Sequence, residues 1–505
     1  MTAVTPTRDS ASRYRIEPTV MQALRSPRLL TREVLAGLVV ALALIPEAIA
    51  FSIIAGVDPR VGLFSSFIMA VAIAFLGGRP AMITAATGAI ALVIAPVARE
   101  YGMDYFIATV LLGGLIQIVL ALLGVAKLMR FIPRSVMVGF VNALAILIFT
   151  SQFPQLIGVP WLVYPLVAVG LLVMYLMPRI TKVVPAPLVA IVLLTAAVVV
   201  FAWNVPNVGD QGELPESLPA LFIPNVPLTF ETLQIIAPYA LAMAVVGLLE
   251  SLMTAKLVDD ITDTHSRKTR EALGQGAANV LSGAFGGMGG CAMIGQTMIN
   301  VKASGARTRI STFLAGVFLL VLVLALGDVV AIIPMAALVA VMILVSIATF
   351  DWHSIRLSTL KRMPKSETAV MLITVIATVW THNLAVGVIL GVIAAMIMFA
   401  RRVAHFVSVT RTIDDDASTA RYAVNGELFF ASSNDLTTQF EYADDPDTVV
   451  IDMSRSHVWD ASTVAALDAI VTKYEHHGKS VTIEGLNDTA AAFHDRLTGN
   501  LGNGH

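Results

Sequence analysis

Long apolar runs separated by short polar breaks recur along the chain from about Val34 to Phe406. A transmembrane helix needs about 20 mostly apolar residues, and run length together with Gly and Pro breakers predicts fourteen such helices here. The first seven are expected near 34–54, 60–77, 84–98, 106–124, 133–151, 161–177 and 184–203. The second seven are expected near 231–258, 271–286, 292–303, 309–326, 331–349, 366–381 and 384–405. The pattern therefore predicts a mostly α-helical membrane protein.

The composition supports this interpretation, because 57% of the residues are hydrophobic and only 13% are charged. Soluble domains have roughly 25% charged residues. A net charge of −2 gives no basic field for nucleic acid. The single cysteine, Cys291, has no partner for a disulfide. We expect a multi-pass protein of the cell inner (plasma) membrane, surrounded by the lipid bilayer and without a nucleic-acid partner.

Basic residues fall in alternate loops, as the positive-inside rule requires. The long loop 204–229 on the opposite side contains Asp210, Glu213 and Glu216 but no Lys or Arg. Both termini are therefore predicted to be cytoplasmic, and residues 1–32 are expected to form a cytoplasmic tail rather than a cleaved signal. The basic residues on the side of the N-terminus are Arg79; Lys127, Arg130 and Arg134; Arg179 and Lys182; Arg267, Lys268 and Arg270; Lys302, Arg307 and Arg309; Arg356, Lys361, Arg362 and Lys365; and Arg401 and Arg402.

The two halves of the membrane region resemble each other. Gly114 begins an apolar run whose Ile-Pro end, Pro133, follows by 19 residues, and Gly316 begins one whose Ile-Pro end, Pro334, follows by 18. Seven helices per copy is an odd number, so the second copy must cross the membrane upside down. The spacing therefore predicts a 7+7 inverted repeat, in which broken helices point their N-termini at a site near the midplane.

The glycine-rich segment 286–290 interrupts an apolar stretch just before the tenth predicted helix. Backbone N–H groups that such a break exposes at membrane depth must face protein, water or a ligand, and the positive end of a helix favours an anion. We expect unpaired N–H groups around two helix starts to face one anion: Thr87, Gly88 and Ala89 in the third helix, and Ala292, Met293 and Ile294 in the tenth.

Four side chains in these segments are candidate donors to the anion: Thr84, Thr87, Gln296 and Thr297. Each helix end supplies up to about 2 kcal/mol, whereas moving an ion out of water costs several kcal/mol. The helix ends alone barely offset that cost, so we expect the anion to stay partly hydrated or to use these additional donors.

Two carboxylates lie inside predicted spans, Glu47 in the first helix and Glu250 in the eighth, with Thr254 one turn after Glu250. Charged groups inside membranes are rare and usually functional. An ionised carboxylate at ~4 Å from an anion opposes its binding by about 4 kcal/mol at an effective dielectric constant of ~20. We therefore predict proton-coupled uptake with Glu250 as the proton carrier; the alternative is a carboxylate held by helix N–H groups.

Several motifs resemble the SulP sulfate-permease and solute-carrier-26 family of anion transporters, over nearly the whole chain. Residues 45–51 read IPEAIAF, 55–59 read AGVDP and 62–66 read GLFSS. The second-half motif consists of Gln275-Gly276, Gly283, Phe285, Gly286-Gly287, Thr297 and Asn300. The resemblance implies a core (transport) bundle and a gate bundle, a substrate site between helices 3 and 10, a homodimer and a cytoplasmic STAS domain.

The resemblance also assigns roles within the site. Glu47 and Glu250 flank the substrate in the family, and Phe51 matches an aromatic side chain that walls the site. A bicarbonate-transporting branch binds sodium at an aspartate and a threonine in the places of Glu250 and Thr254, so the glutamate weakens the case for sodium here. Several relatives have an arginine near Gln296 or Thr297 that this chain lacks.

After Thr412 the composition becomes that of a soluble domain. Strand-like segments at 428–430, 449–453 and 480–483 alternate with helix-like segments at 434–443 and 461–477, which predicts a small α/β domain. The expected division is a tail at 1–32, a transport domain at 33–408, a STAS domain at 409–498 and a tail at 499–505. By resemblance, Ser462 is a candidate phosphorylation site; the alternative is that Asp460 or Ser462 only caps the helix.

Other classes of protein fit less well. An ATP-driven pump fails because Lys473 stands where a phosphate loop needs its first glycine. No clustered nucleophile, base or metal ligands emerge, so we expect neither an enzyme nor a bound cofactor or metal. A sodium-coupled bicarbonate transporter, a passive anion channel and a nucleobase carrier stay open, and the anion is left as sulfate, bicarbonate or a small dicarboxylate.

Overall fold

The computed structural model describes residues 18–127, 132–180, 185–404, 407–414 and 418–498. The chain divides into two compact units, Met1–Val392 and Ile393–His505. Residues 1–17 of the predicted N-terminal tail, the predicted tail 499–505, residues 184 and 405 of two predicted helices, and Arg130 and Lys182 of the predicted cytoplasmic side lie outside the described residues.

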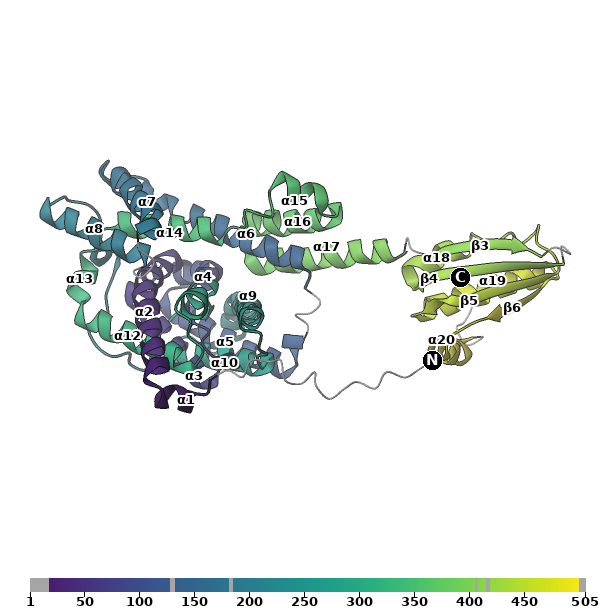
Figure 1. Ribbon diagram of the computed structural model, residues 1–505, viewed down its shortest axis with the longest axis horizontal. Helices are drawn as coiled ribbons and strands as arrows, with labels where there is room; N and C mark the ends of the chain where they lie inside the picture. Colours follow the sequence, from purple (N-terminus) through teal and green to yellow (C-terminus); the bar gives the residue numbers. More distant parts are fainter. Residues whose placement is uncertain (1–17, 128–131, 181–184, 405–406, 415–417, 499–505) are drawn as a thin grey trace. The chain divides into compact units, whose positions relative to one another are not determined.

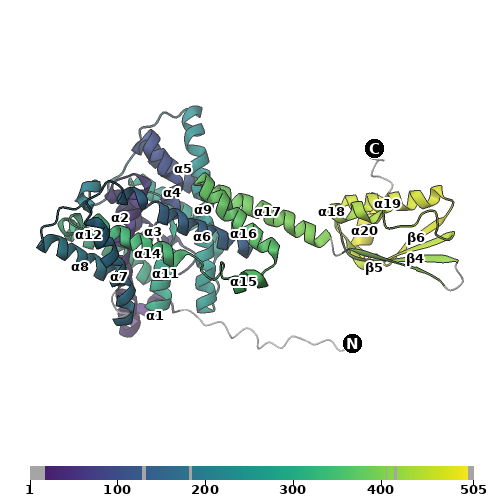
Figure 2. The same cartoon turned by 90° about the horizontal axis from the view of Figure 1, so that it is seen from above.

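In the described residues of the first unit the regular structure is helical apart from two very short strands (Figures 1 and 2). Its first half contains α1 (Val20–Arg25), α2 (Pro27–Ala55), α3 (Pro59–Leu76), β1 (Thr84–Ala86), α4 (Gly88–Tyr101), α5 (Met103–Leu122), α6 (Arg134–Thr150), η3 (Phe153–Leu156), α7 (Val163–Ile180) and α8 (Ala186–Val200). Its second half contains η4 (Val208–Gln211), α9 (Phe230–Thr262), α10 (Lys268–Ala284), β2 (Gly290–Ala292), α11 (Ile294–Met298), η5 (Ile299–Ala303), α12 (Arg309–Ala325), α13 (Gly327–Ala331), α14 (Met335–Thr349), α15 (Leu357–Arg362) and α16 (Lys365–Thr381). The helix α17 (Leu384–Ala404) begins in the first unit and ends in the second.

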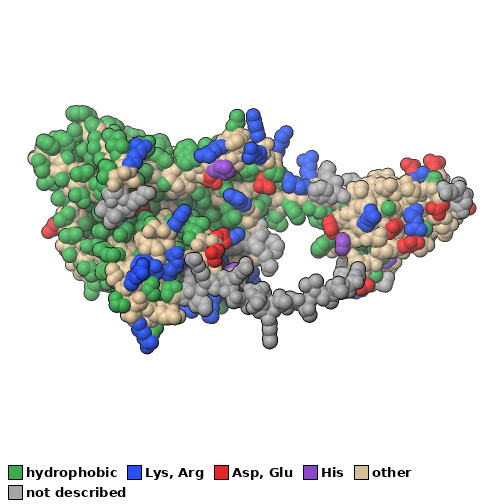
Figure 3. Space-filling model, viewed as in Figure 1, with side chains coloured by type: hydrophobic (Ala, Val, Ile, Leu, Met, Phe, Trp, Pro, Cys, Tyr) green, Lys and Arg blue, Asp and Glu red, His purple; other side chains and the backbone are tan. Residues whose placement is uncertain are grey.

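Seven of the described helical segments are long and apolar enough to cross a membrane, and three shorter helices are also apolar. Hydrophobic side chains cover much of the visible face of this unit in Figure 3. The chain is therefore an integral membrane protein. The predicted total of fourteen spans stays a prediction.

Helix packing repeats between the two halves. α5 packs on α10 as α12 packs on α3, and α2 packs on α12 as α9 packs on α5. In a second group, α6 packs on α16 as α14 packs on α7. This pairwise correspondence is what an inverted repeat produces, and it separates a bundle containing α2–α5 and α9–α12 from one containing α6–α8, α14 and α16.

The residues that marked the repeat in the sequence occupy equivalent places. A Cβ atom on Gly114 of α5 would lie 2.9 Å from the carbonyl oxygen of Gly276 in α10, and one on Gly316 of α12 would lie 3.0 Å from the carbonyl oxygen of Phe67 in α3. Pro133 and Pro334 are the residues before α6 and α14. Each glycine therefore allows an equivalent close crossing with a helix of the other half.

Three predicted helices differ from the observed elements. The first begins at Pro27, before the predicted start at Val34. The third begins only at Gly88, because residues 84–86 form β1. The tenth, predicted as one helix over 292–303, consists of the end of β2, the α-helix α11 and the π-helix η5.

The second unit contains a four-stranded sheet in the order β3-β4-β5-β6, with strands β3 (Ser408–Ile413), β4 (Thr419–Leu428), β5 (Thr448–Val458) and β6 (Ser480–Glu484) and helices α18 (Phe430–Leu436), α19 (Ala461–His476) and α20 (Asp488–Leu497). β3 pairs antiparallel with β4, and the other two pairings are parallel. The predicted strand at 428–430 was wrong, because β4 ends at Leu428 and Phe430 begins a helix. The β3–β4 hairpin and α20 were not predicted.

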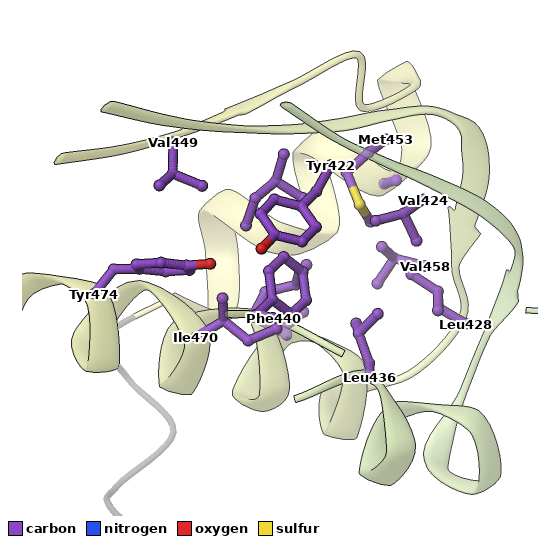
Figure 4. Close-up of a cluster of buried hydrophobic side chains, with 14 of the residues drawn as sticks. Tyr422, Val424, Leu428, Leu436, Phe440, Val449, Met453, Val458, Ile470 and Tyr474 are labelled. Carbon is purple, nitrogen blue, oxygen red and sulfur yellow. The ribbon is translucent and has the colours of Figure 1, made fainter. Parts of the chain in front are cut away.

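A buried carboxylate organises the core of this unit. The Oδ2 atom of Asp445 accepts hydrogen bonds from the hydroxyl groups of Tyr422 (2.6 Å) and Tyr474 (2.5 Å), and Oδ1 pairs with Arg411 at 2.7 Å. In Figure 4 the two tyrosine rings enter the hydrophobic core with their hydroxyl groups turned toward the same space. Burial, followed by the hydrogen bond to Asp445, raises the pKa of both tyrosines.

Candidate anion site

The two halves of the membrane unit are joined by a pair of three-residue strands, one from each half. β1 and β2 pair antiparallel, with Thr84 opposite Ala292 and Ala86 opposite Gly290. A Cβ atom on Gly290 would lie 2.0 Å from the carbonyl oxygen of Ala85, so only glycine allows this pairing. This strand pair, the β1–β2 crossing, brings the two interrupted helices of the repeat, the third and the tenth, close together.

Each strand leads directly into a helix start. α4 begins at Gly88 after Thr87, and α11 begins at Ile294 after Met293; neither preceding residue caps its helix with a side-chain hydrogen bond. The first N–H groups of a helix have no partner inside the helix, and the partial positive charge is greatest there. Two positive helix ends therefore start from the same strand pair.

Two of the predicted free N–H groups are paired instead. The N–H of Ala292 donates to Oγ of Ser251 (3.0 Å), and the N–H of Met293 donates to the carbonyl of Ile83 (2.9 Å). The expectation that Ala292 and Met293 offer unpaired donors was therefore wrong. Both N–H groups hold β2 against its neighbours. On the α11 side, only the N–H groups from Ile294 onward are left as candidate donors to an anion.

Two of the predicted side-chain donors also hold the strands. The hydroxyl of Thr84 accepts from Nε2 of Gln275 (2.8 Å), and the hydroxyl of Thr297 accepts from the N–H of Ile83 (3.0 Å). Both threonines are fully buried. Their hydroxyl groups therefore fix the β1 segment to α10 and α11.

Glu47 on α2 and Gln296 on α11, two of the predicted site residues, contact each other. Nε2 of Gln296 donates to Oε1 of Glu47 at 2.7 Å, and Oε1 of Gln296 is buried without a described partner. Glu47 is partly exposed. A polar atom without a partner beside a partly exposed carboxylate indicates a place where water or a ligand is accommodated.

Glu250 lies on the other side of the crossing, in a chain of three polar side chains. Its Oε2 atom accepts from Sγ of Cys291 (2.9 Å), which lies 3.1 Å from Oγ1 of Thr87. The hydroxyl of Thr254 bonds to the backbone carbonyls of Glu250 (2.8 Å) and Ala292 (3.3 Å). No Lys or Arg of the described part of the chain forms an ion pair with Glu47 or Glu250.

The starts of α4 and α11 differ in how closely they are covered. A Cβ atom on Gly88 would lie 2.9 Å from Phe51 and 3.2 Å from Ile148, so these two side chains close over the start of α4; Ala89 behind it is buried. Gly295 in the first turn of α11 is exposed and has no atom within 4 Å of its Cβ position. Solvent therefore reaches the start of α11.

Several residues that shape the site were not predicted. The side-chain amide of Asn279 pairs with both backbone groups of Gly290 and also donates to Gln117. Ser251 and Ile148 were missed as well. Gln275, Asn279 and Ser282 repeat at helical spacing on α10, and that polar stripe inside a membrane span was the available signal.

The described residues contain no group of three or more His, Cys, Asp or Glu side chains able to hold a metal ion. The chemistry of the site is thus that of N–H donors, hydroxyl groups and two carboxylates, with Gly295 exposed and Glu47 partly exposed. Helices packed in inverted pairs around two interrupted helices define a membrane transport protein.

Comparison with known proteins identifies the family. The Sulfate permease family matches residues 30–169 and 159–374, and the STAS domain matches residues 410–497. The chain belongs to the sulfate permease family, whose members are anion transporters and not enzymes.

Relatives match over most of the chain. “Putative sulfate transporter YbaR” of Bacillus subtilis (strain 168) is 51% identical over 462 residues, which is 92% of this chain and 96% of that protein. “Bicarbonate transporter BicA” of Picosynechococcus sp. is 26% identical over 495 residues, with 87% and 86% covered.

Solved structures share the fold. The transmembrane domain of a cyanobacterium bicarbonate transporter BicA aligns with a TM-score of 0.63 at 26% identity, covering 73% of this chain and 98% of that one. The murine solute carrier 26 family member A9 anion transporter aligns with a TM-score of 0.79 at 16% identity, covering 96% and 88%.

Proposed function

We propose that the protein is a secondary active transporter of a small oxyanion, either sulfate, bicarbonate or a dicarboxylate. The anion binds between the starts of α4 and α11, and the two bundles move relative to each other to expose this site to alternate sides. Relatives named as sulfate and bicarbonate transporters support an anion as the substrate.

The observation that carries the proposal is the convergence of two uncapped helix starts on the β1–β2 crossing. Gly88 and Ala89 on α4 and Ile294 on α11 supply N–H donors, Thr87 and Gln296 supply side-chain donors, and Phe51 closes one side. Each helix end contributes up to about 2 kcal/mol. Because desolvation costs several kcal/mol, the exposed position of Gly295 matters: it lets the anion keep part of its water.

The argument for proton coupling starts from two carboxylates, Glu47 and Glu250, that have no ion pair among the described residues. A bound anion ~4 Å from an ionised Glu250 is opposed by about 4 kcal/mol at an effective dielectric constant of ~20. Among the described residues no cation neutralises this charge, so the anion and a proton bind together and cross together. Glu250 is the proposed proton carrier.

The sodium-coupled alternative would use Glu250 and Thr254. The hydroxyl hydrogen of Thr254 points to backbone carbonyls of Glu250 and Ala292, and a sodium ion at this place would use the same carbonyls. A passive anion channel is the alternative of another class. Both alternatives predict flux that does not depend on a proton gradient.

The test is uptake of radiolabelled sulfate, and separately of bicarbonate and succinate, into proteoliposomes with imposed proton or sodium gradients. Saturable uptake driven by inward protons, lost in Glu250→Gln and unchanged in Glu231→Gln, is the expected result. Glu231 is a matched control because it lies at the exposed start of the same helix. Uptake driven only by sodium, unitary currents, or an unchanged pH dependence in Glu250→Gln would each contradict proton coupling.

We further propose a transport domain at residues 33–408 and a STAS domain at 409–498, in a homodimer of the cell inner membrane with both termini cytoplasmic. Ser462 is exposed in the first turn of α19, while Asp460 caps that helix by accepting from the N–H of Thr463 (3.1 Å). A phosphate at Ser462 would therefore sit beside a helix N-terminus, where negative charge is favoured. Mass spectrometry of protein purified from its own cells tests this assignment.

A further inference from the structure

A hollow lies between the two bundles, away from the β1–β2 strand pair. Its volume is ≈ 540 Å³, and its walls come from α2, α4 and α9 on one side and from α6, α14 and the turn between α16 and α17 on the other. Ala50, Leu92 and Leu147 are among the lining residues. Leu92 is four residues after Gly88, so the hollow ends about 6 Å along α4 from the proposed anion site.

The side chains that separate the hollow from the site are Phe51 and Ile148. Each follows a lining residue in sequence, and both are buried against Gly88. The hollow is therefore positioned on the path that an anion would follow to the start of α4, with Phe51 and Ile148 as the closed constriction.

The lining residues of the hollow carry a positive charge, although the carboxylate of Glu100, outside the lining, lies close enough to Tyr239 in the wall to act on it electrostatically. Among its lining residues Arg99, in the last turn of α4, is the only Arg or Lys, and no lining residue is Asp or Glu. Its Nη2 atom donates to the carbonyl of Ile54 at 3.0 Å, and no carboxylate of the described residues forms an ion pair with it. Arg60 differs, because it pairs with Glu213 and lies outside the lining.

The opposite wall adds neutral donors. Gln155 and Asn383 line the hollow on the side opposite α4. Oδ1 of Asn383 accepts from the N–H groups of Ala385 and Val386, which leaves its NH₂ group for another acceptor. A guanidinium group and amide N–H groups facing one polar hollow are the donors that recognise an oxyanion.

We propose that this hollow is a second, outer anion-binding station, in which Arg99 attracts the oxyanion before it passes Phe51 and Ile148. This inference rests on the proposed transport function. Arg99 lies eleven residues after Gly88, about 16 Å along α4, which exceeds the Debye length of about 8 Å at physiological salt. At physiological salt its charge therefore acts mainly on capture of the anion in the hollow and only weakly on the anion held at the central site.

The test is the kinetics of sulfate uptake from the side that the 204–229 loop faces. A Ser217→Cys substitution in that loop, labelled with an impermeant maleimide, reports the orientation in proteoliposomes, since Cys291 is fully buried. KM and kcat are compared for the parent, Arg99→Gln, Arg99→Lys and Arg60→Gln at ionic strengths of about 0.01 M and about 0.15 M. Arg99→Gln keeps a donor for the carbonyl of Ile54 but removes the charge.

We expect Arg99→Gln to raise KM about fivefold at low salt, the effect of one unit charge at contact distance in water. The rise should shrink at the higher salt concentration, kcat should not change, and Arg99→Lys and Arg60→Gln should resemble the parent. Asn383→Asp is a second variant that keeps the acceptor for Ala385 and adds a negative charge to the hollow; it should raise KM in the same salt-dependent way.

An unchanged KM in Arg99→Gln and Asn383→Asp would contradict the proposal that the hollow binds the anion. A loss of kcat at both salt concentrations would instead indicate that Arg99 has a structural role, through its hydrogen bond to the carbonyl of Ile54 at the end of α2. A change in KM that follows the anionic-lipid content of the liposomes would assign it to a lipid phosphate instead. If the parent protein carries no anion at all, the proposed function itself fails, and that outcome is distinct from each of these.

Discussion

The thiol of Cys291 on β2 donates to Oε2 of Glu250 on α9 at 2.9 Å, so the proposed proton carrier is tied directly to the strand crossing. Cys291 lies opposite Ala85 in the strand pair and contacts the hydroxyl of Thr87, which precedes α4. A change in the charge of Glu250 therefore alters the hydrogen bonding of Cys291, in the strand before α11, and of Thr87, the residue before α4.

Removing this thiol should weaken the membrane unit. No other described side chain donates to the Glu250 carboxylate, and leaving a buried acceptor without its donor costs about 1–3 kcal/mol. We expect Cys291→Ala to lower the thermal unfolding temperature in detergent and to alter the pH dependence of uptake, whereas Cys291→Ser, which keeps a donor, should change both less. Equal effects of the two substitutions would indicate that packing, not the hydrogen bond, is what Cys291 supplies.

Two glycines of the same segment should respond in opposite ways to one added methyl group. In Gly290→Ala the new Cβ would lie 2.0 Å from the carbonyl oxygen of Ala85, so we expect a loss of more than about 4 kcal/mol or no folded protein. Gly295 has open space at its Cβ position. Gly295→Ala should therefore fold normally, and a raised KM for the anion would place substrate in that space.

The measurement for this pair is thermal unfolding for stability and sulfate uptake for KM. Gly295→Ala with normal folding and an unchanged KM would contradict the proposed position of the anion. A folded Gly290→Ala protein with parent stability would contradict the close approach of the strands.

The features predicted from sequence were those that depend on local chemistry and repetition. Apolar length predicted the helices, and Gly114 and Gly316 marked equivalent crossings because a close approach needs a residue without a side chain. The strands β1 and β2 were not predicted, since Thr-Ala-Ala and Gly-Cys-Ala have no strand pattern and pair only through the tertiary fold.

Tertiary packing also explains why part of the predicted site was wrong. The N–H of Ala292 is a free donor in an isolated helix start, and only the packing of α9 brings Ser251 to it. Phe429 and Phe430 continue an apolar run, but the polypeptide leaves the sheet after Leu428, so neither belongs to the strand. Which polar groups meet across helices is set by tertiary packing and not by any segment alone.

The buried carboxylate of the STAS domain should be important for its stability. Asp445→Ala would leave the hydroxyl groups of Tyr422 and Tyr474 without their acceptor and Arg411 without its partner. Breaking a buried pair in this way costs about 3–5 kcal/mol. Urea unfolding of a fragment spanning 407–498 measures the loss, with the exposed neighbour Asp444→Ala as the control. Equal urea midpoints for the two variants would contradict the role given to Asp445.

The same fragment should lose stability in alkali. Burial, followed by the proximity of Tyr422, raises the pKa of Tyr442 to about 12, whereas an unfolded tyrosine has a pKa of about 10. Between these values the folded domain holds a proton that the unfolded chain releases, so the free energy of unfolding falls as pH rises from about 10 to about 12. Tyr442→Phe removes this contribution, so its urea midpoint should fall less steeply over that range than the parent's. Because lysines titrate in both proteins alike, only the difference between the two slopes reports on Tyr442, and parallel slopes would contradict the assignment.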